Sequence, residues 1–205
     1  MLRTPRLSWQ NLLVLGSLTT TAIWLWLQRN PVRHPPDDTD AILAPADGKV
    51  LLVENGPSPG WVDGPAWRIA IYLSLLDVHV QRAPVAGRVG LSEKRRGSYR
   101  PAYALQAAAN AGHALGIENQ RGRILVIRSA GIVARRVTTC IREGDELAAG
   151  QRIGRIFLGS LTEIYLPGTV NICIQAGKRV RAGETILAHW EGQRWGPGYL
   201  TADCS

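Results

Sequence analysis

Glycine and proline interrupt this 205-residue chain at short intervals: it contains 22 Gly and 12 Pro. Such residues end strands and form turns, so their abundance favours a turn-rich β fold. Short apolar runs lie between them, several with β-branched residues at alternate positions, at 49–53, 67–73, 123–128 and 131–138. This alternation is typical of strands with one buried face. The sequence therefore predicts a mainly β body.

Two segments of the body, 142–156 and 175–187, share a pattern of paired Gly turns separated by apolar residues. Paired hairpins of this kind resemble the flattened barrel-sandwich folds of lipoyl and biotinyl carrier domains. The modifiable lysine of a carrier is absent, which disfavours a carrier function. The Ala-rich segment 102–114 is the one clear helix candidate of the body. We predict a β-rich α+β fold: a flattened barrel-sandwich-like body with one helical excursion.

Residues 12–27 carry no charge and read LLVLGSLTTTAIWLWL. At about 1.5 Å per residue, a helix of this length is near the lower limit for crossing a bilayer. Trp24 and Trp26 fit an interfacial aromatic belt. No small-residue cleavage site follows, which disfavours a signal peptide, and the Pro-rich charged stretch beyond it disfavours a core helix. We expect a membrane-anchor helix that spans the bilayer or lies in its interface.

The chain length suits one domain with a short appendage. We expect a membrane anchor at 1–28, a polar Pro-rich linker at 29–40 and a single body at 41–205. The net charge of +8 suits an anionic partner, either nucleic acid or an acidic membrane leaflet. No nucleic-acid-binding motif accompanies the charge, so we expect an anionic membrane surface and no nucleic acid. Basic clusters that could meet it are 94–96 and the turn with Lys178, Arg179 and Arg181.

The three cysteines, Cys140, Cys173 and Cys204, have neither the spacing of a metal site nor that of a disulfide framework. Asp77 and His79 are two residues apart, so on a strand they face the same side. Each segment with candidate catalytic residues is weak alone, because Asp-Gly and Gly-Ser are ordinary turn signals. The four segments are PADG (45–48), YLSLLDVHVQRAP (72–84), ENQR (118–121) and FLGSLTEIYLP (157–167).

In this order and spacing, the segments resemble the phosphatidylserine decarboxylases, in particular their short form with an N-terminal anchor and a compact body. The resemblance covers residues 29–188 and depends on the spaced set rather than on one motif. Its further landmarks are RNPVR (29–33), AGIVARR (130–136), EGDEL (143–147) and YLP (165–167).

The resemblance implies a proenzyme that cuts itself between Gly159 and Ser160. The Ser160 hydroxyl would attack the Gly159 carbonyl, and a weak nucleophile of this kind needs a nearby base. His79 is the candidate base and Asp47 the candidate that orients it, with Asp77 as a second supporting carboxylate. The products would be a β chain, residues 1–159, and an α chain, residues 160–205, that begins with a pyruvoyl group made from Ser160.

By the same resemblance, the pyruvoyl group is the cofactor, and no metal is expected. It would form a Schiff base with the amine of phosphatidylserine and accept electrons as carbon dioxide leaves. His79 would then donate the proton that completes phosphatidylethanolamine. The expected location is the cell membrane, with the body in the cytoplasm. Assembly into a homo-oligomer is a further possibility that the sequence does not decide.

The chain departs from the family at two positions. Longer members have a second histidine where this chain has Arg82, and the family usually has a glutamate where this chain has Gln120. These departures and the breadth of the motifs leave other hypotheses open. They are a decarboxylase of another serine-headed lipid such as archaetidylserine, a paralogue that no longer processes itself, and a non-catalytic, membrane-anchored barrel-sandwich adaptor. Adaptors usually carry long helical hairpins, which the sequence does not predict.

Overall fold

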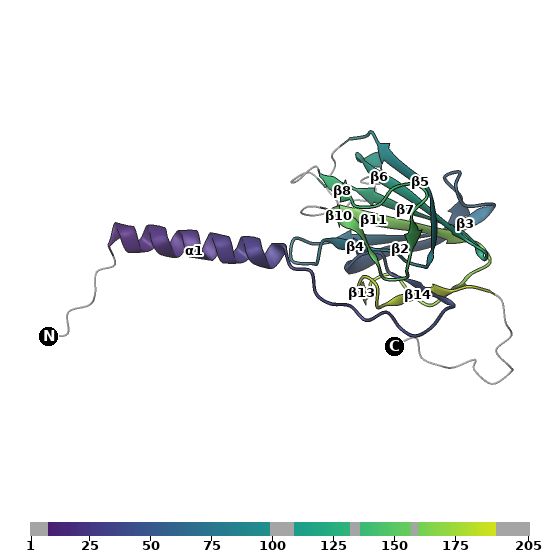
Figure 1. Ribbon diagram of the computed structural model, residues 1–205, viewed down its shortest axis with the longest axis horizontal. Coiled ribbons are helices and arrows are strands. Elements are labelled where there is room, and N and C mark those ends of the chain that lie inside the picture. Colours follow the sequence, from purple (N-terminus) through teal and green to yellow (C-terminus); the bar gives the residue numbers. More distant parts are fainter. Residues whose placement is uncertain (1–7, 99–108, 132–135, 157–159, 192–205) are drawn as a thin grey trace.

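The computed structural model describes residues 8–98, 109–131, 136–156 and 160–191. Its one helix within these ranges, α1 (Trp9–Leu27), projects away from a β body (Figure 1). The side chain of Ser8 accepts a hydrogen bond from the Asn11 N–H and so caps the first turn. No residue of α1 is buried. Within the described residues, no helix has both the length and the apolar character that crossing a membrane requires.

The body is built on a curled sheet of eight strands in which all neighbours pair antiparallel. Two central strands, β3 and β7, enclose β11, which therefore pairs along both of its edges. In spatial order the strands are β13 (Arg179–Val180), β2 (Gly48–Pro57), β3 (Pro65–Leu73), β11 (Ser160–Pro167), β7 (Gly122–Ser129), β6 (Gly112–Asn119), β5 (Gly87–Arg95) and β9 (Glu146–Leu147).

Two three-stranded antiparallel sheets complete the body. One of them contains the strand that leads into the predicted cleavage segment. The first sheet is β1 (Ala41–Leu43), β14 (Ile186–His189) and β12 (Asn171–Ile172), and the second is β4 (Val80–Arg82), β10 (Arg152–Ile156) and β8 (Val137–Thr139).

The strand β7 shows why an uninterrupted apolar run forms a strand here. Ile124 and Val126 face the main core, while Leu125 and Ile127 pack in a second cluster on the other face of the sheet. Successive side chains of a strand point to opposite faces, so both faces of β7 are covered. Each buried aliphatic side chain contributes roughly 1.5–3 kcal/mol through the hydrophobic effect.

The structure confirms the mainly β prediction, and the runs at 49–53, 67–73 and 123–128 lie in β2, β3 and β7. The run at 131–138 is described only in part, and its end lies in β8. The helical prediction at 102–114 is wrong for residues 112–114, which begin β6. A Cβ on Gly112 would meet the backbone carbonyl of Arg128, so strand pairing at close range overrides the local Ala-rich propensity. Residues 102–108 lie outside the described residues.

The expected linker runs along the body from the end of α1 to β1 (Figure 1). Arginine side chains hold it there. Arg33 of the linker forms an ion pair with Asp47 at 2.7 Å, and Arg82 donates to the Pro31 carbonyl at 3.0 Å. Just before the linker, Arg155 donates to the Gln28 carbonyl at 2.7 Å. The linker is thus docked on the same part of the body that carries Asp47.

Candidate active site

Ser160 is the first residue of the central strand β11 and is fully buried. It pairs with Leu73 at the end of β3. Within the described residues, its hydroxyl has no hydrogen-bond partner. The other half of the predicted cleavage bond, Gly159, lies outside the described residues. Among the described residues, therefore, nothing satisfies this desolvated serine hydroxyl.

His79 lies between β3 and β4 and is also buried. Its backbone carbonyl accepts a hydrogen bond from the Ile156 N–H at 3.1 Å. This contact places His79 beside the end of β10, four residues before Ser160 in the chain. The ring atom Nε2 has no hydrogen-bond partner among the described residues. His79 Nε2 is therefore, like the Ser160 hydroxyl, a buried polar atom without a partner among the described residues.

A buried side-chain hydrogen bond joins the two segments that carry Ser160 and His79. The Thr162 hydroxyl on β11 donates to the Gln81 side-chain carbonyl on β4 at 3.0 Å. Ser160 lies two residues before Thr162, so their side chains leave the same face of β11. His79 lies two residues before Gln81, directly before the first residue of β4. This bond links β11 to β4, the strands that begin at the predicted nucleophile and directly after the predicted base, both of which are buried.

Burial lowers the pKa of His79 below its usual range because a charged imidazole is poorly solvated there. A hydrogen bond from the ring to the Asp77 backbone carbonyl and the charge of Asp77 act in the opposite direction, raising the pKa. The positive charges of Arg155 and Arg29 lower it further. With the net shift downward, the imidazole is neutral at neutral pH. A neutral ring can accept a proton from a hydroxyl.

The carboxylate of Asp77 closes the turn that carries His79. Its Oδ2 accepts hydrogen bonds from the Ser74 backbone N–H at 2.8 Å and from the Ser74 hydroxyl at 2.6 Å. Its Oδ1 forms an ion pair with Arg179 at 3.1 Å. Both oxygens are thus occupied by groups that fix the turn, and the influence of Asp77 on the imidazole runs through its backbone carbonyl and its charge.

Asp47 is buried, and both of its oxygens are engaged. Oδ2 pairs with Arg33 at 2.7 Å, and Oδ1 accepts from the Ala182 N–H at 2.7 Å. Burial raises the pKa of the Asp47 carboxyl, an effect that the Ala182 N–H and the Arg33 guanidinium partly offset. The charge of Asp77 raises it further, so the two carboxylates share one electrostatic environment. No hydrogen bond joins Asp47 to His79 in the described residues, and its orienting role stays a prediction.

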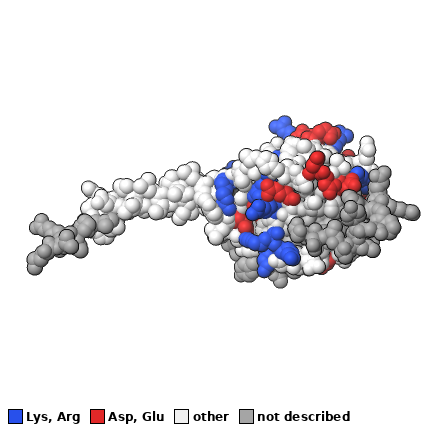
Figure 2. Space-filling view, turned by 90° about the horizontal axis from the view of Figure 1, so that it is seen from below, with Lys and Arg blue, Asp and Glu red and all other residues white. Residues whose placement is uncertain are grey.

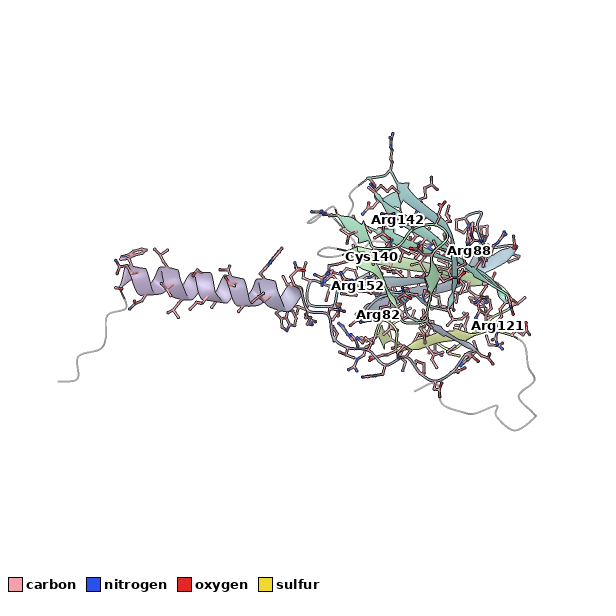
Figure 3. All side chains as sticks on the ribbon, viewed as in Figure 1. Arg82, Arg88, Arg121, Cys140, Arg142 and Arg152 are labelled. Carbon is pink, nitrogen blue, oxygen red and sulfur yellow. The ribbon has the colours of Figure 1, made fainter. Side chains whose placement is uncertain are left out.

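The arginines around these groups had no role assigned from the sequence. Arg29 donates to the Leu76 carbonyl in the turn before His79, and Arg33 binds Asp47 and Glu184. Arg29 and Arg33 are the two arginines of the RNPVR landmark, and that motif was the sequence signal that could have pointed to their role. Arg82, at the position of the family's second histidine, donates to the Gly150 and Pro31 carbonyls at 2.9 and 3.0 Å. Figure 3 shows Arg82 on the side of the body nearest α1.

The second departure from the family pattern lies elsewhere. Gln120 is in the turn between β6 and β7, whereas the opposite end of β7, Ser129, pairs with Leu161 beside the candidate site. The neighbouring Arg121 is on the side of the body farthest from α1 (Figure 3). Gln120 lines a surface hollow together with Asp38 and Trp190. The absence of a carboxylate at position 120 therefore leaves the surroundings of Ser160 unchanged.

Two further histidines have contacts that do not involve Ser160. His113 is buried, its Nδ1 lies 2.8 Å from Arg128 Nη2, and its Nε2 lies 3.3 Å from the Ser92 hydroxyl. His189 pairs with Asp38 at 3.0 Å. Within the described part of the chain, no group of His, Cys, Asp or Glu side chains could hold a metal ion.

Together, fold and site define a class: a β-rich protein with a buried serine at the start of a central strand and a buried, neutral histidine bonded to the strand that precedes that serine in the chain. Comparisons with known proteins agree with this class and narrow it. The family model described as phosphatidylserine decarboxylase matches residues 21–188. The chain therefore belongs to the phosphatidylserine decarboxylase family, as the motif resemblance predicted.

Three relatives carry the name phosphatidylserine decarboxylase proenzyme. That of Carboxydothermus hydrogenoformans is 43% identical over 166 residues, covering 80% of this chain and 78% of the relative. That of Desulfotalea psychrophila is 36% identical and covers 83% and 80%. That of Nocardia farcinica is 39% identical and covers 84% and 75%. The similarity thus extends over most of each protein rather than over a single motif.

Proposed function

We propose that this chain is a self-cleaving proenzyme that decarboxylates phosphatidylserine to phosphatidylethanolamine. The observation that carries the proposal is a pair of buried atoms without partners among the described residues, Ser160 Oγ on β11 and His79 Nε2 directly before β4. Membership of the family and the printed names of the relatives support the substrate and the proenzyme state.

Self-cleavage would begin when His79 Nε2 takes the proton from the Ser160 hydroxyl. The oxygen then attacks the Gly159 carbonyl carbon, the Gly159–Ser160 C–N bond breaks, and the proton passes to the freed nitrogen. An ester now links the two residues. Loss of the Ser160 α-proton, with departure of the Gly159 carboxylate, leaves dehydroalanine, which water converts to a pyruvoyl group and ammonia.

The surroundings of residue 160 fit such a group. The position is fully buried at the start of β11, and a pyruvoyl group is small and uncharged, so it can remain there without the desolvation cost of an ion. When present, it supplies the electron sink for decarboxylation. The chain itself would supply the proton from His79, and Asp77 would hold the turn that positions this histidine.

Comparison of two buried serines tests this role. Ser160→Ala removes the proposed nucleophile, whereas Ser129→Ala removes a hydroxyl that is also buried and unpartnered, on the neighbouring strand β7. Denaturing intact-mass spectrometry and release of carbon dioxide from phosphatidylserine are measured for the purified full chain. We expect two fragments and activity for the wild type and for Ser129→Ala, and one uncut, inactive chain for Ser160→Ala. Cleavage of Ser160→Ala at the same bond would refute the mechanism.

We also propose that α1 anchors the enzyme to the cell membrane with its body in the cytoplasm. The helix exposes a large apolar surface, including Trp9, Leu13, Leu18 and Leu25. Such surface is unfavourable in water and favourable at the acyl-chain boundary of a bilayer. Removal of residues 1–28 should release a large part of the protein from the membrane pellet into the supernatant. Full retention of the shortened chain in the pellet would contradict the anchor.

A further inference from the structure

Exposed large hydrophobic side chains are confined to one end of the molecule. Within the described residues, all of them belong to α1 except Val32 in the linker and two adjacent leucines in the body. These are Leu75, which is 49% exposed, and Leu76, which is 67% exposed. They occupy the turn between β3 and His79, which we call the leucine turn, residues 74–77.

The leucine turn is held in a defined shape and joined to α1. Asp77 bonds the backbone and side chain of Ser74, so the turn is closed beneath the two leucines. Arg29 donates to the Leu76 carbonyl, and its guanidinium lies 3.7 Å from the centre of the Trp26 ring near the end of α1. The exposed leucines and the exposed helix are therefore connected through a single arginine.

The same end of the main sheet carries the basic clusters. Register across the sheet places Arg95 beside Gly112 and Gly112 beside Ser129, which pairs with Leu161 next to Ser160. Exposed Lys94 and Arg96 lie next to Arg95. On the other edge, Arg179 is 63% exposed and pairs with Asp77 of the leucine turn. Basic side chains also gather where α1 meets the body (Figure 2).

We propose that the leucine turn is a second membrane contact: Leu75 and Leu76 enter the headgroup–acyl boundary of an anionic bilayer beside α1, with the basic clusters on its headgroups. An apolar tip flanked by cations fits this surface, since apolar side chains gain by leaving water and each cation gains from anionic lipid. The contact places His79 and Ser160 just above the headgroup layer. The inference rests on the proposed function only for the identity of the lipid that reacts at this surface.

Depth-sensitive labelling tests the contact without any catalytic readout. In a Cys140→Ser/Cys173→Ser/Cys204→Ser background, Leu75→Cys carries an environment-sensitive NBD fluorophore. The matched control is Pro59→Cys in the β2–β3 turn, at the opposite end of β3. Vesicles contain equal parts of phosphatidylcholine and phosphatidylglycerol. We expect a blue shift and a severalfold rise in emission at position 75 and neither at position 59. An unchanged spectrum at position 75, or equal changes at both positions, would overturn the proposal.

Activity provides a second, separable test. Leu75→Ser/Leu76→Ser should lose roughly tenfold activity on phosphatidylserine in vesicles while keeping that on a short-chain, water-soluble phosphatidylserine. Leu75→Ile/Leu76→Ile should keep both. Wild-type activity on vesicles in the serine variant would refute the contact. Loss of activity on the soluble lipid as well would mean that the leucines serve the catalytic site instead. A wild-type chain inactive on both lipids would count against the proposed function, and the labelling result would still decide the contact.

Discussion

The body buries two histidines in polar surroundings, and they differ in how fully those surroundings satisfy them. His113 has a partner for each ring nitrogen, Arg128 on one side and Ser92 on the other. His79 leaves Nε2 without a partner in the described residues, as Ser160 does its hydroxyl. A satisfied polar cluster stabilises a fold, whereas an unsatisfied one costs free energy and is expected where a reaction will use it.

Burial acts on the two rings in the same direction. It lowers the pKa of His79 and lowers that of His113 to about 4, where the adjacent Arg128 charge adds to the effect. A lowered pKa alone therefore does not distinguish a base from a structural histidine. The two histidines differ instead in their hydrogen bonds: both ring nitrogens of His113 have partners, whereas His79 Nε2 has none among the described residues.

The largest effect should come from His79→Gln. We expect the rate of self-cleavage to fall by roughly 10²–10⁴-fold, the usual contribution of a positioned general base, with little change in melting temperature. The readout is the fraction of cut chain against time after purification. His113→Gln, its matched control, should still cleave; equal losses of cleavage in the two variants would remove the distinction between these histidines.

Arg128→Met should have the next largest effect, on stability. The substitution removes the donor to His113 and to the Thr138 carbonyl. Each buried acceptor left without a partner should lower the free energy of unfolding by about 1–3 kcal/mol. Denaturant unfolding of the uncut Ser160→Ala chain measures this loss within a single covalent chain. Unchanged stability would mean that the His113 region is not the structural cluster described above.

The pH dependence of stability should report His113. Since its pKa falls from 6.5 in the unfolded chain to about 4 in the fold, the unfolded state binds more protons between these values. Its contribution to stability is therefore complete above about pH 6.5 and is lost as the pH falls towards 4. Melting temperatures across this window should drop less steeply for His113→Gln than for the parent; identical slopes would contradict this assignment.

Arg179→Gln should have the smallest effect. Its ion pair with Asp77 is at the surface, where such pairs contribute about 0–1 kcal/mol, so cleavage should slow by less than about fivefold. Asp77→Asn, which also weakens the bonds to Ser74, should slow it more. A larger effect from the arginine would show that the turn depends on the ion pair.

Alternation and Gly turns predicted the runs that lie in β2, β3 and β7, because these patterns reflect the immediate surroundings of each residue. Ser160, His79, Asp47 and Asp77 became candidates through the family resemblance of the spaced motifs, since each motif is weak alone. Local patterns could not predict that Arg29 reaches the turn at Leu76 or that Arg33 binds Asp47, because these contacts join segments brought together only by the fold. The predicted helix fails at Gly112 for the same reason: pairing with β7 is a long-range interaction.

The central position of β11 has a consequence for folding. A cut before Ser160 would leave this strand between β3 and β7, with the main core as the interface between two polypeptides. Separating the two pieces would then be the same event as unfolding them. Before the cut, folding is unimolecular. After it, recovery from denaturation depends on the concentration of both pieces. The uncut chain should therefore refold more readily from dilute solution than the cut protein.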